Sequence, residues 1–123
     1  MASSGDVLKS FYKAIVARDF AAASKFLHDD MVFDGLFESY PNADAYMATF
    51  TGLMSITKRL DVLAVIAEGN EVAVFFELET GAPAPATTLV AEWHRVRGGK
   101  IYHARSAFDG RPFAAMFSGA KKN

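Results

Sequence analysis

The sequence contains no cysteine among its 123 residues. Disulfides, thiolate nucleophiles and cysteine-ligated metals are therefore excluded. An excess of one charge is lacking as well, because 13 basic and 14 acidic residues give a formal net charge of -1. Binding to nucleic acid requires a basic field that holds phosphates, so we expect no nucleic acid among the partners.

Long hydrophobic runs and catalytic signature motifs are also absent. No run is long enough to span a bilayer, and residues 1–5 lack the basic and apolar regions of a signal peptide. We therefore expect a cytoplasmic protein with no membrane partner. The sequence has no glycine-rich phosphate loop, no Gly-x-Ser-x-Gly elbow and no His-Glu-x-x-His pattern. Its three histidines, His28, His94 and His103, lack metal-ligand spacing within one element, so we expect neither a metal nor a cofactor.

Hydrophobic residues, in contrast, are plentiful. They make up 51% of the chain and include 11 phenylalanines, which is enough apolar mass for a substantial core. No repeat, low-complexity block or shift in composition divides the sequence. We therefore predict one domain over residues 1–123, with frayed ends near 1–5 and 119–123.

The first half of the sequence has the periodicity of helices. Apolar residues spaced by three and four predict a first helix capped by Asp6, and Asp19 predicts the cap of a second helix that ends at residues 28–30. A third helix is predicted to begin at Asp44. The residues expected on the inner faces are Leu8, Phe11, Tyr12, Ile15 and Val16, then Ala23, Phe26 and Leu27, then Tyr46, Met47, Phe50, Leu53 and Met54.

The second half has the pattern of strands. A short strand is predicted at 31–33, and longer ones at 57–67, 71–79, 86–97 and 100–109. The third of these five alternates cleanly, with Val72, Val74, Phe76 and Leu78 on one side. Helices followed by antiparallel strands predict an α+β domain with the helices on one face of a curved sheet.

The last two strands form a predicted hairpin over Gly98-Gly99, a pair suited to a tight turn. With Arg97 opposite Lys100, His94 faces His103 and Glu92 faces Arg105, as a pair of opposite charge. One face then carries Leu89, Ala91, Trp93, Ala104, Ser106 and Phe108. The other carries Val90, Glu92, His94, Val96, Ile101, His103, Arg105, Ala107 and Asp109.

This second, mixed face has two interpretations. It lines a polar pocket, with His94 as acid/base and Glu92 tuning it, or it is the outer face of the sheet, solvated or used for dimerisation. We favour the outer face. A bulge would invert the assignment, because a slip of one residue moves every side chain to the opposite face.

Three stretches carry a resemblance to a known superfamily. Residues 17–20 through 26–35 look like a helix pair that runs into a short strand ending in an acid. Residues 92–101 are similar to an acid–aromatic–basic strand before a Gly-Lys-Ile turn, and residues 107–109 to a strand ending in aromatic-Asp. The chain thereby resembles the nuclear transport factor 2-like superfamily, and within it the SnoaL-like and ketosteroid isomerase-like proteins.

The resemblance implies a cone-shaped nuclear transport factor 2-like (cystatin-like) fold around one pocket. This fold hosts isomerases, dehydratases, epoxide hydrolases, cyclases and non-catalytic domains, so it does not decide the activity. In the isomerase-like relatives a general base lies near Asp34, which is otherwise a turn residue beside Gly35. Tyr12 is either an oxyanion-stabilising group or a core tyrosine whose hydroxyl reaches the surface.

Two functions of different classes follow. The first is a cofactor-independent isomerase, dehydratase or cyclase that acts by proton transfer on a small apolar carbonyl compound, with Asp34, Glu92, His94 and Asp109 as candidate groups. The second is a non-catalytic domain that binds a small hydrophobic ligand or associates through its sheet. We expect the pocket between the first and third helices and the sheet. Its expected lining residues are Tyr12, Phe33, Phe50, Met54, Trp93 and Phe108.

We also expect a homodimer through the sheet. Phe75 lies between Ala73 and Glu77 on the outward register of its strand, where polar residues would be usual. Related folds often pair in this way.

Overall fold

The structure, a computed structural model, describes residues 3–114. Three helices and six strands follow one another along these residues. In chain order they are α1 (Ser4–Val16), α2 (Phe20–Ser24), β1 (Leu27–Asp34), β2 (Ser39–Tyr40), α3 (Ala43–Ser55), β3 (Thr57–Glu68), β4 (Glu71–Thr80), β5 (Ala86–Arg97) and β6 (Lys100–Phe108), followed by a 3-10 turn at Arg111–Phe113.

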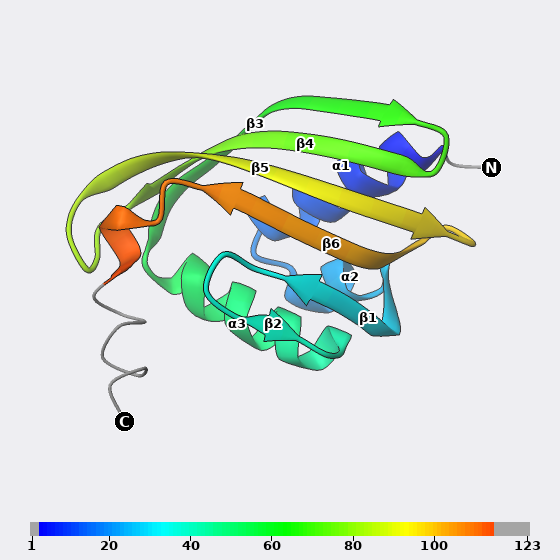
Figure 1. Ribbon diagram of the computed structural model, residues 1–123, viewed down its shortest axis with the longest axis horizontal. Helices are drawn as coiled ribbons and strands as arrows, with labels where there is room; N and C mark the ends of the chain where they lie inside the picture. The colour runs from blue at the N-terminus through cyan, green and yellow to red at the C-terminus, as the bar shows by residue number, and fades with distance from the viewer. Residues whose placement is uncertain (1–2, 115–123) are drawn as a thin grey trace.

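The strands form one six-stranded sheet in the order β2-β1-β6-β5-β4-β3. All neighbouring strands are antiparallel except β1 and β6, which run parallel. The sheet bends over the helices, which all lie on one of its sides (Figure 1). The predicted α+β class and the predicted placement of the helices on one face of a curved sheet are confirmed.

The helices begin at capping residues that lie slightly earlier than expected. Ser3 caps α1, and Asp6 completes a capping box from the first turn instead of acting as the cap. The N-terminus was expected to fray through residue 5, yet Ser4 and Gly5 already belong to the helix. Asn42, not Asp44, caps α3, whereas Asp19 caps α2 as predicted.

Helix α2 is shorter than predicted, and β1 is longer. Residues 28–30 lie in the strand and do not end the helix. The backbone explains this, because Ile101 of β6 donates its N–H to the carbonyl of Phe26 and pairs with Leu27. The ring of His28 also bonds to the carbonyl of Arg97 across 2.9 Å. Pairing with β6 therefore decides where the strand begins, and a helical reading of its polar residues was wrong.

The core lies between the helices and the inner face of the sheet. The alternating residues of β4 are buried there, as predicted. They pack against the buried stripe of α1, whose Phe11 and Tyr12 are almost completely enclosed. Among residues 3–114, no helix is both long and apolar enough to cross a membrane. The sequence also predicts that Arg111-Pro112-Phe113 opens a last helical turn through Met116 and Phe117, and these last two residues lie outside the described part of the chain.

A bulge near the hairpin turn changes the predicted register. Arg97 pairs with Lys100 and Val96 with Ile101, as expected, but Arg95 then pairs with His103, so that Tyr102 is the extra residue. His94 consequently faces Ala104, and Glu92 faces Ser106 and not Arg105. From Ala104 to Phe108, the even-numbered residues of β6 share the inner face with the even-numbered residues of β5. The preference for an outer-face position of Glu92 and His94 was therefore wrong.

Candidate functional site

A cavity of about 470 Å³ lies between α3, the β1–β2 connection, the 3-10 turn and the inner face of the sheet. Its lining is mainly aromatic and aliphatic, as is usual for sites that bind small molecules. Phe33, Phe50 and Phe108 line it as expected from the sequence. Among the further lining residues are Leu36, Phe37, Tyr46, Leu53, Ile56, Phe76, Leu78, Val90 and Glu92.

Three residues expected in this lining lie elsewhere. Tyr12 and Met54 are buried in the core and are not in contact with the cavity. Trp93 lies on the outer face of the sheet, where it is 41% exposed and donates its indole N–H to Glu71 across 2.8 Å. The cavity thus lies further along α3, away from α1, than the sequence suggested.

Glu92 is the acidic group that β5 brings to this cavity. The alternation of the strand turns its side chain inward between Val90 and His94, and only 7% of it is exposed. Within residues 3–114, both of its hydrogen bonds end at one carboxylate oxygen, Oε1. The second oxygen, Oε2, is therefore the atom left to meet a ligand.

Tyr12 holds one side of this carboxylate. Its hydroxyl donates to Glu92 Oε1 from α1, the helix that packs against β3 and β4. Burial and the neighbouring carboxylate raise the pKa of Tyr12 well above 10. The hydroxyl is therefore a protonated donor, and neither of the two roles expected for Tyr12 describes it, because it contacts Glu92 and reaches neither the cavity nor the surface.

His94 is the second hydrogen-bond partner of the same carboxylate oxygen. Its Nε2 lies 2.9 Å from Glu92 Oε1 and 3.4 Å from the Tyr12 hydroxyl, and the ring is completely buried. With Glu92 ionised, Nε2 donates. The other ring nitrogen, Nδ1, is buried without a hydrogen-bond partner among residues 3–114. A buried charge needs such donors, so Tyr12 and His94 together keep a carboxylate at the edge of an apolar cavity.

Tyr46 is a polar residue of the cavity that the sequence reading placed only in the core. It lies on α3 and packs its ring against Phe33 at 4.7 Å between ring centroids. Burial and the charge of Glu92 raise the pKa of Tyr46 well above 10. An inward aromatic at helical spacing reads as core, and nothing in the sequence distinguishes a tyrosine that lines a cavity from one that fills a core.

Two of the four predicted proton-transfer groups lie away from the cavity. Asp34, at the end of β1, accepts from Ser39 and pairs with His103 Nε2, each across 2.9 Å, on the outer side of the sheet. Both hydrogen bonds lower the pKa of Asp34. Asp109 binds the Arg111 guanidinium in the solvent, which lowers the pKa of Asp109 to about 2. Neither lines the cavity.

Within residues 3–114, no three His, Asp or Glu side chains are grouped so that they could hold a metal ion. The polar residues that line the cavity are Glu38, Tyr40, Tyr46, Thr49, Ser55, Glu92 and Ser106, and the His94 imidazole lies behind Glu92. This set is suited to moving a proton at a bound molecule.

Comparison with known proteins agrees with this architecture. A family model described as the SnoaL-like domain matches residues 8–104. No curated protein matches the chain.

Solved structures show the same fold at low identity. A Xanthomonas campestris protein with a cystatin-like fold has a TM-score of 0.84 at 17% identity, covering 94% of this chain and 98% of its own. A nuclear transport factor 2-like protein from Cytophaga hutchinsonii has 0.79 at 22%, covering 91% and 95%. An epoxide hydrolase from M. tuberculosis has 0.74 at 18%, covering 94% and 90%. The fold expected from the sequence resemblance is confirmed.

Proposed function

This chain belongs to the family of SnoaL-like domains, and from that premise we propose that it binds a small apolar carbonyl compound and that Glu92 transfers a proton on it. One observation carries the proposal. A buried carboxylate, which accepts two hydrogen bonds at a single oxygen, lies at the edge of a mainly apolar cavity. Because the Glu92 side chain is only 6% exposed, its carboxylate oxygen interacts strongly with an acidic hydrogen of a bound molecule.

The proposed proton transfer needs no reactant besides the carbonyl compound and Glu92. Glu92 Oε2 takes the proton from a carbon next to the carbonyl, the C–H electron pair forms a C=C bond, and the C=O π electrons move to the oxygen. If the proton on Glu92 exchanges with solvent before a proton returns to the same carbon, hydrogen is exchanged at that carbon, and return to a conjugated carbon isomerises the compound. One proton leaves and one proton returns, so no oxidant or reductant is consumed.

A second candidate is binding without chemistry. The aromatic and aliphatic lining favours it, since such a cavity retains a hydrophobic ligand whether or not Glu92 reacts with it. The two candidates differ in what Glu92 does. In a binding domain its replacement changes affinity alone, whereas in an enzyme it changes turnover.

The test is hydrogen exchange at the α-carbons of 2-tetralone, followed by proton NMR in D2O after subtraction of the buffer rate. We expect Glu92→Gln, which keeps the shape and an acceptor oxygen, to slow the protein-dependent rate by about 10²- to 10⁴-fold. Asp34→Asn is the matched control, an acid with a histidine partner outside the cavity, and should leave the rate unchanged. Exchange that survives Glu92→Gln contradicts the assignment. Binding by calorimetry without exchange identifies the second candidate.

We further propose that the outer face of the sheet pairs with a second copy of the chain. Its middle is apolar, formed by neighbouring residues of β3 to β6. The apolar residues are Ala64, Ile66, Ala73, Phe75, Leu89, Ala91, Trp93 and Ala107. Two of these residues on different strands, Ile66 and Leu89, are 60% and 58% exposed, and a large exposed apolar patch marks an interaction surface.

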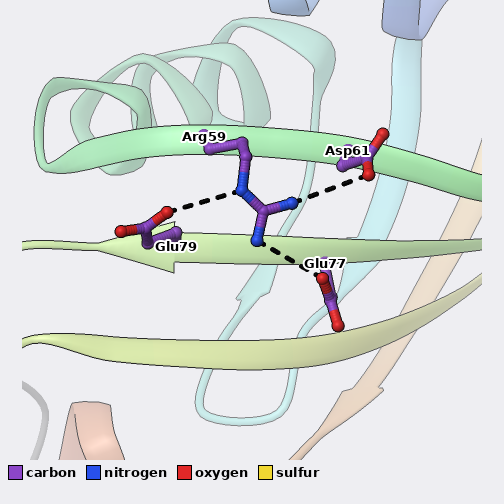
Figure 2. A network of polar contacts seen from close by, with 4 residues as sticks. All are labelled: Arg59, Asp61, Glu77 and Glu79. Carbon is purple, nitrogen blue, oxygen red and sulfur yellow. Dashed lines mark hydrogen bonds and ion pairs between the residues drawn. The ribbon is translucent and has the colours of Figure 1, made fainter.

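Charge supports a second copy as the occupant. At one corner of this face, Arg59 lies among the three carboxylates of Asp61, Glu77 and Glu79, which leaves an excess of negative charge (Figure 2). At the opposite corner β5 and β6 present Arg95, Arg97, Lys100 and Arg105. A two-fold axis in the plane of the interface places the acidic corner of each copy over the basic corner of the other.

Sedimentation tests this pairing. We expect about twice the 13.4 kDa of one chain at micromolar concentration. Leu89→Glu should give monomers, whereas Val16→Glu, at an apolar residue equally exposed on α1, should not. Glu77→Lys and Arg105→Glu should each weaken the dimer, and their combination should restore it. A monomeric wild type, or a double variant no better than either single one, contradicts the proposal.

A further inference from the structure

The Tyr46 hydroxyl is a buried polar atom without a partner. Within residues 3–114, four buried side-chain atoms lack a hydrogen bond: the hydroxyls of Tyr46, Thr80 and Thr88, and Nδ1 of His94. Of these four residues only Tyr46 lines the cavity. An unmatched buried hydroxyl is costly, and its place at a cavity suggests that something else completes it.

The surroundings of Tyr46 fix its position. Its side chain is 3% exposed and is enclosed by the rings of Phe11, Phe33 and Phe50. These contacts leave little freedom to turn the hydroxyl toward another protein group. Tyr46 is thus a rigid residue of the cavity lining with an unpaired hydroxyl. The Tyr12 hydroxyl, in contrast, already donates to Glu92.

The nearby charge of Glu92 helps to keep the Tyr46 hydroxyl protonated. The Glu92 carboxylate is close enough to raise the pKa of Tyr46, in addition to the effect of burial. The hydroxyl therefore keeps its proton throughout the neutral and mildly alkaline range. The Tyr46 hydroxyl can therefore donate a hydrogen bond to an acceptor atom of a ligand that lies near the Glu92 carboxylate.

We propose that Tyr46 is the ligand-recognising residue of the cavity: its hydroxyl donates to the one acceptor atom, a carbonyl oxygen, of an otherwise apolar ligand whose neighbouring C–H faces Glu92. This inference rests on the proposed function and deepens it by naming the ligand class and the group that selects it. It distinguishes a ketone from the hydrocarbon of the same shape, which the apolar lining accepts equally well.

Tyr46→Phe should leave the stability of the free protein unchanged or raise it, while it lowers the affinity for the ligand. In the free protein the hydroxyl has no partner among the described residues, so Tyr46→Phe removes an unsatisfied polar atom and no hydrogen bond. The midpoint of urea unfolding should stay the same or rise. A residue with a purely structural role would not combine that result with a loss of ligand affinity.

The experiment compares two probes by calorimetry: 2-tetralone, which has one carbonyl, and tetralin, which has the same rings and no polar atom. The wild type should prefer the ketone, and Tyr46→Phe should reduce that preference by about 3- to 10-fold, the effect of one hydrogen bond, with little change for tetralin. Tyr102→Phe is the control, because Tyr102 lies at the bulge of β6 and does not line the cavity.

The outcomes separate this inference from the function on which it rests. A ketone preference that Tyr46→Phe leaves intact overturns the role of Tyr46 while the ligand class stands. An equal loss for both probes, or a lower urea midpoint, shows a structural role and also overturns it. If neither probe binds the wild type, the proposed carbonyl ligand is wrong and the inference falls with it.

Discussion

Two acid–histidine pairs lie on opposite faces of the same sheet, and each has a distance of 2.9 Å between a carboxylate oxygen and Nε2. Glu92 and His94 form the inner pair, with side chains 6% and 0% exposed. Asp34 and His103 form the outer pair, at 41% and 23%. Their geometry is alike, so the difference between them is burial.

Burial changes what such a pair can do. Around the outer pair, water screens both groups and makes their interaction weak, and neither residue lines the cavity described above. Around the inner pair, protein atoms replace water, every electrostatic interaction is stronger, and Glu92 meets the cavity. The comparison teaches that the spacing of an acid and a histidine does not identify a site until the surrounding medium is known.

The largest expected difference is in stability after loss of each histidine. His94→Ala leaves a hole in the core and removes a donor from a buried carboxylate, so we expect a loss of about 3–5 kcal/mol in the free energy of unfolding. His103→Ala removes a half-solvated partner and should cost less than about 1 kcal/mol. Urea unfolding of both variants checks this. Equal losses would show that burial does not separate the pairs.

A smaller effect is expected when the tyrosine of the inner pair loses its hydroxyl. Tyr12→Phe keeps the buried ring but removes a hydrogen bond to the Glu92 carboxylate. We expect a loss of about 1.5–3 kcal/mol, typical for a hydrogen bond to a charged group. Ser39→Ala, which removes a hydroxyl from the Asp34 carboxylate, is the outer counterpart and should cost only a few tenths of a kcal/mol. A Tyr12→Phe variant as stable as the wild type would contradict the inner network.

The smallest effect is the pH dependence of the outer pair. Hydrogen bonds from His103 and Ser39 hold the pKa of Asp34 below its ordinary value of 3.8, so the folded protein binds this proton more weakly than the unfolded chain. The resulting stabilisation is present above 3.8 and is lost as the pH falls through the lowered pKa. Asp34→Asn should therefore differ from the wild type by less than about 1 kcal/mol at pH 7 and converge with it in acid. Thermal unfolding across pH 2–7 measures the difference, and a gap that widens in acid would contradict it.

Much of the fold could be predicted because local signals and the global arrangement agree. The apolar stripe of α1, the alternation of β4 and the Gly98-Gly99 turn each specify one element, and all three are where the sequence indicates. The beginning of β1 could not be predicted, because it depends on pairing with β6, a partner far along the chain.

The site was predicted only in part for a related reason. Glu92 and His94 were correctly placed on one face, since period-2 alternation requires it. The bulge at Tyr102 decides which residues of β6 share a face with Glu92 and His94, and it could not be predicted because no glycine marks the position. Asp34 was placed by resemblance, and its side chain turns to the outer face, where Ser39 and His103 hold it.

The most direct test of the inner pair as the functional one is a crystal structure of the protein with 2-tetralone. The account predicts the ketone in the cavity, with its oxygen within hydrogen-bonding distance of the Tyr46 hydroxyl and an α-carbon against Glu92 Oε2. A ketone bound instead on the outer face beside Asp34 and His103, with the cavity empty, would contradict it.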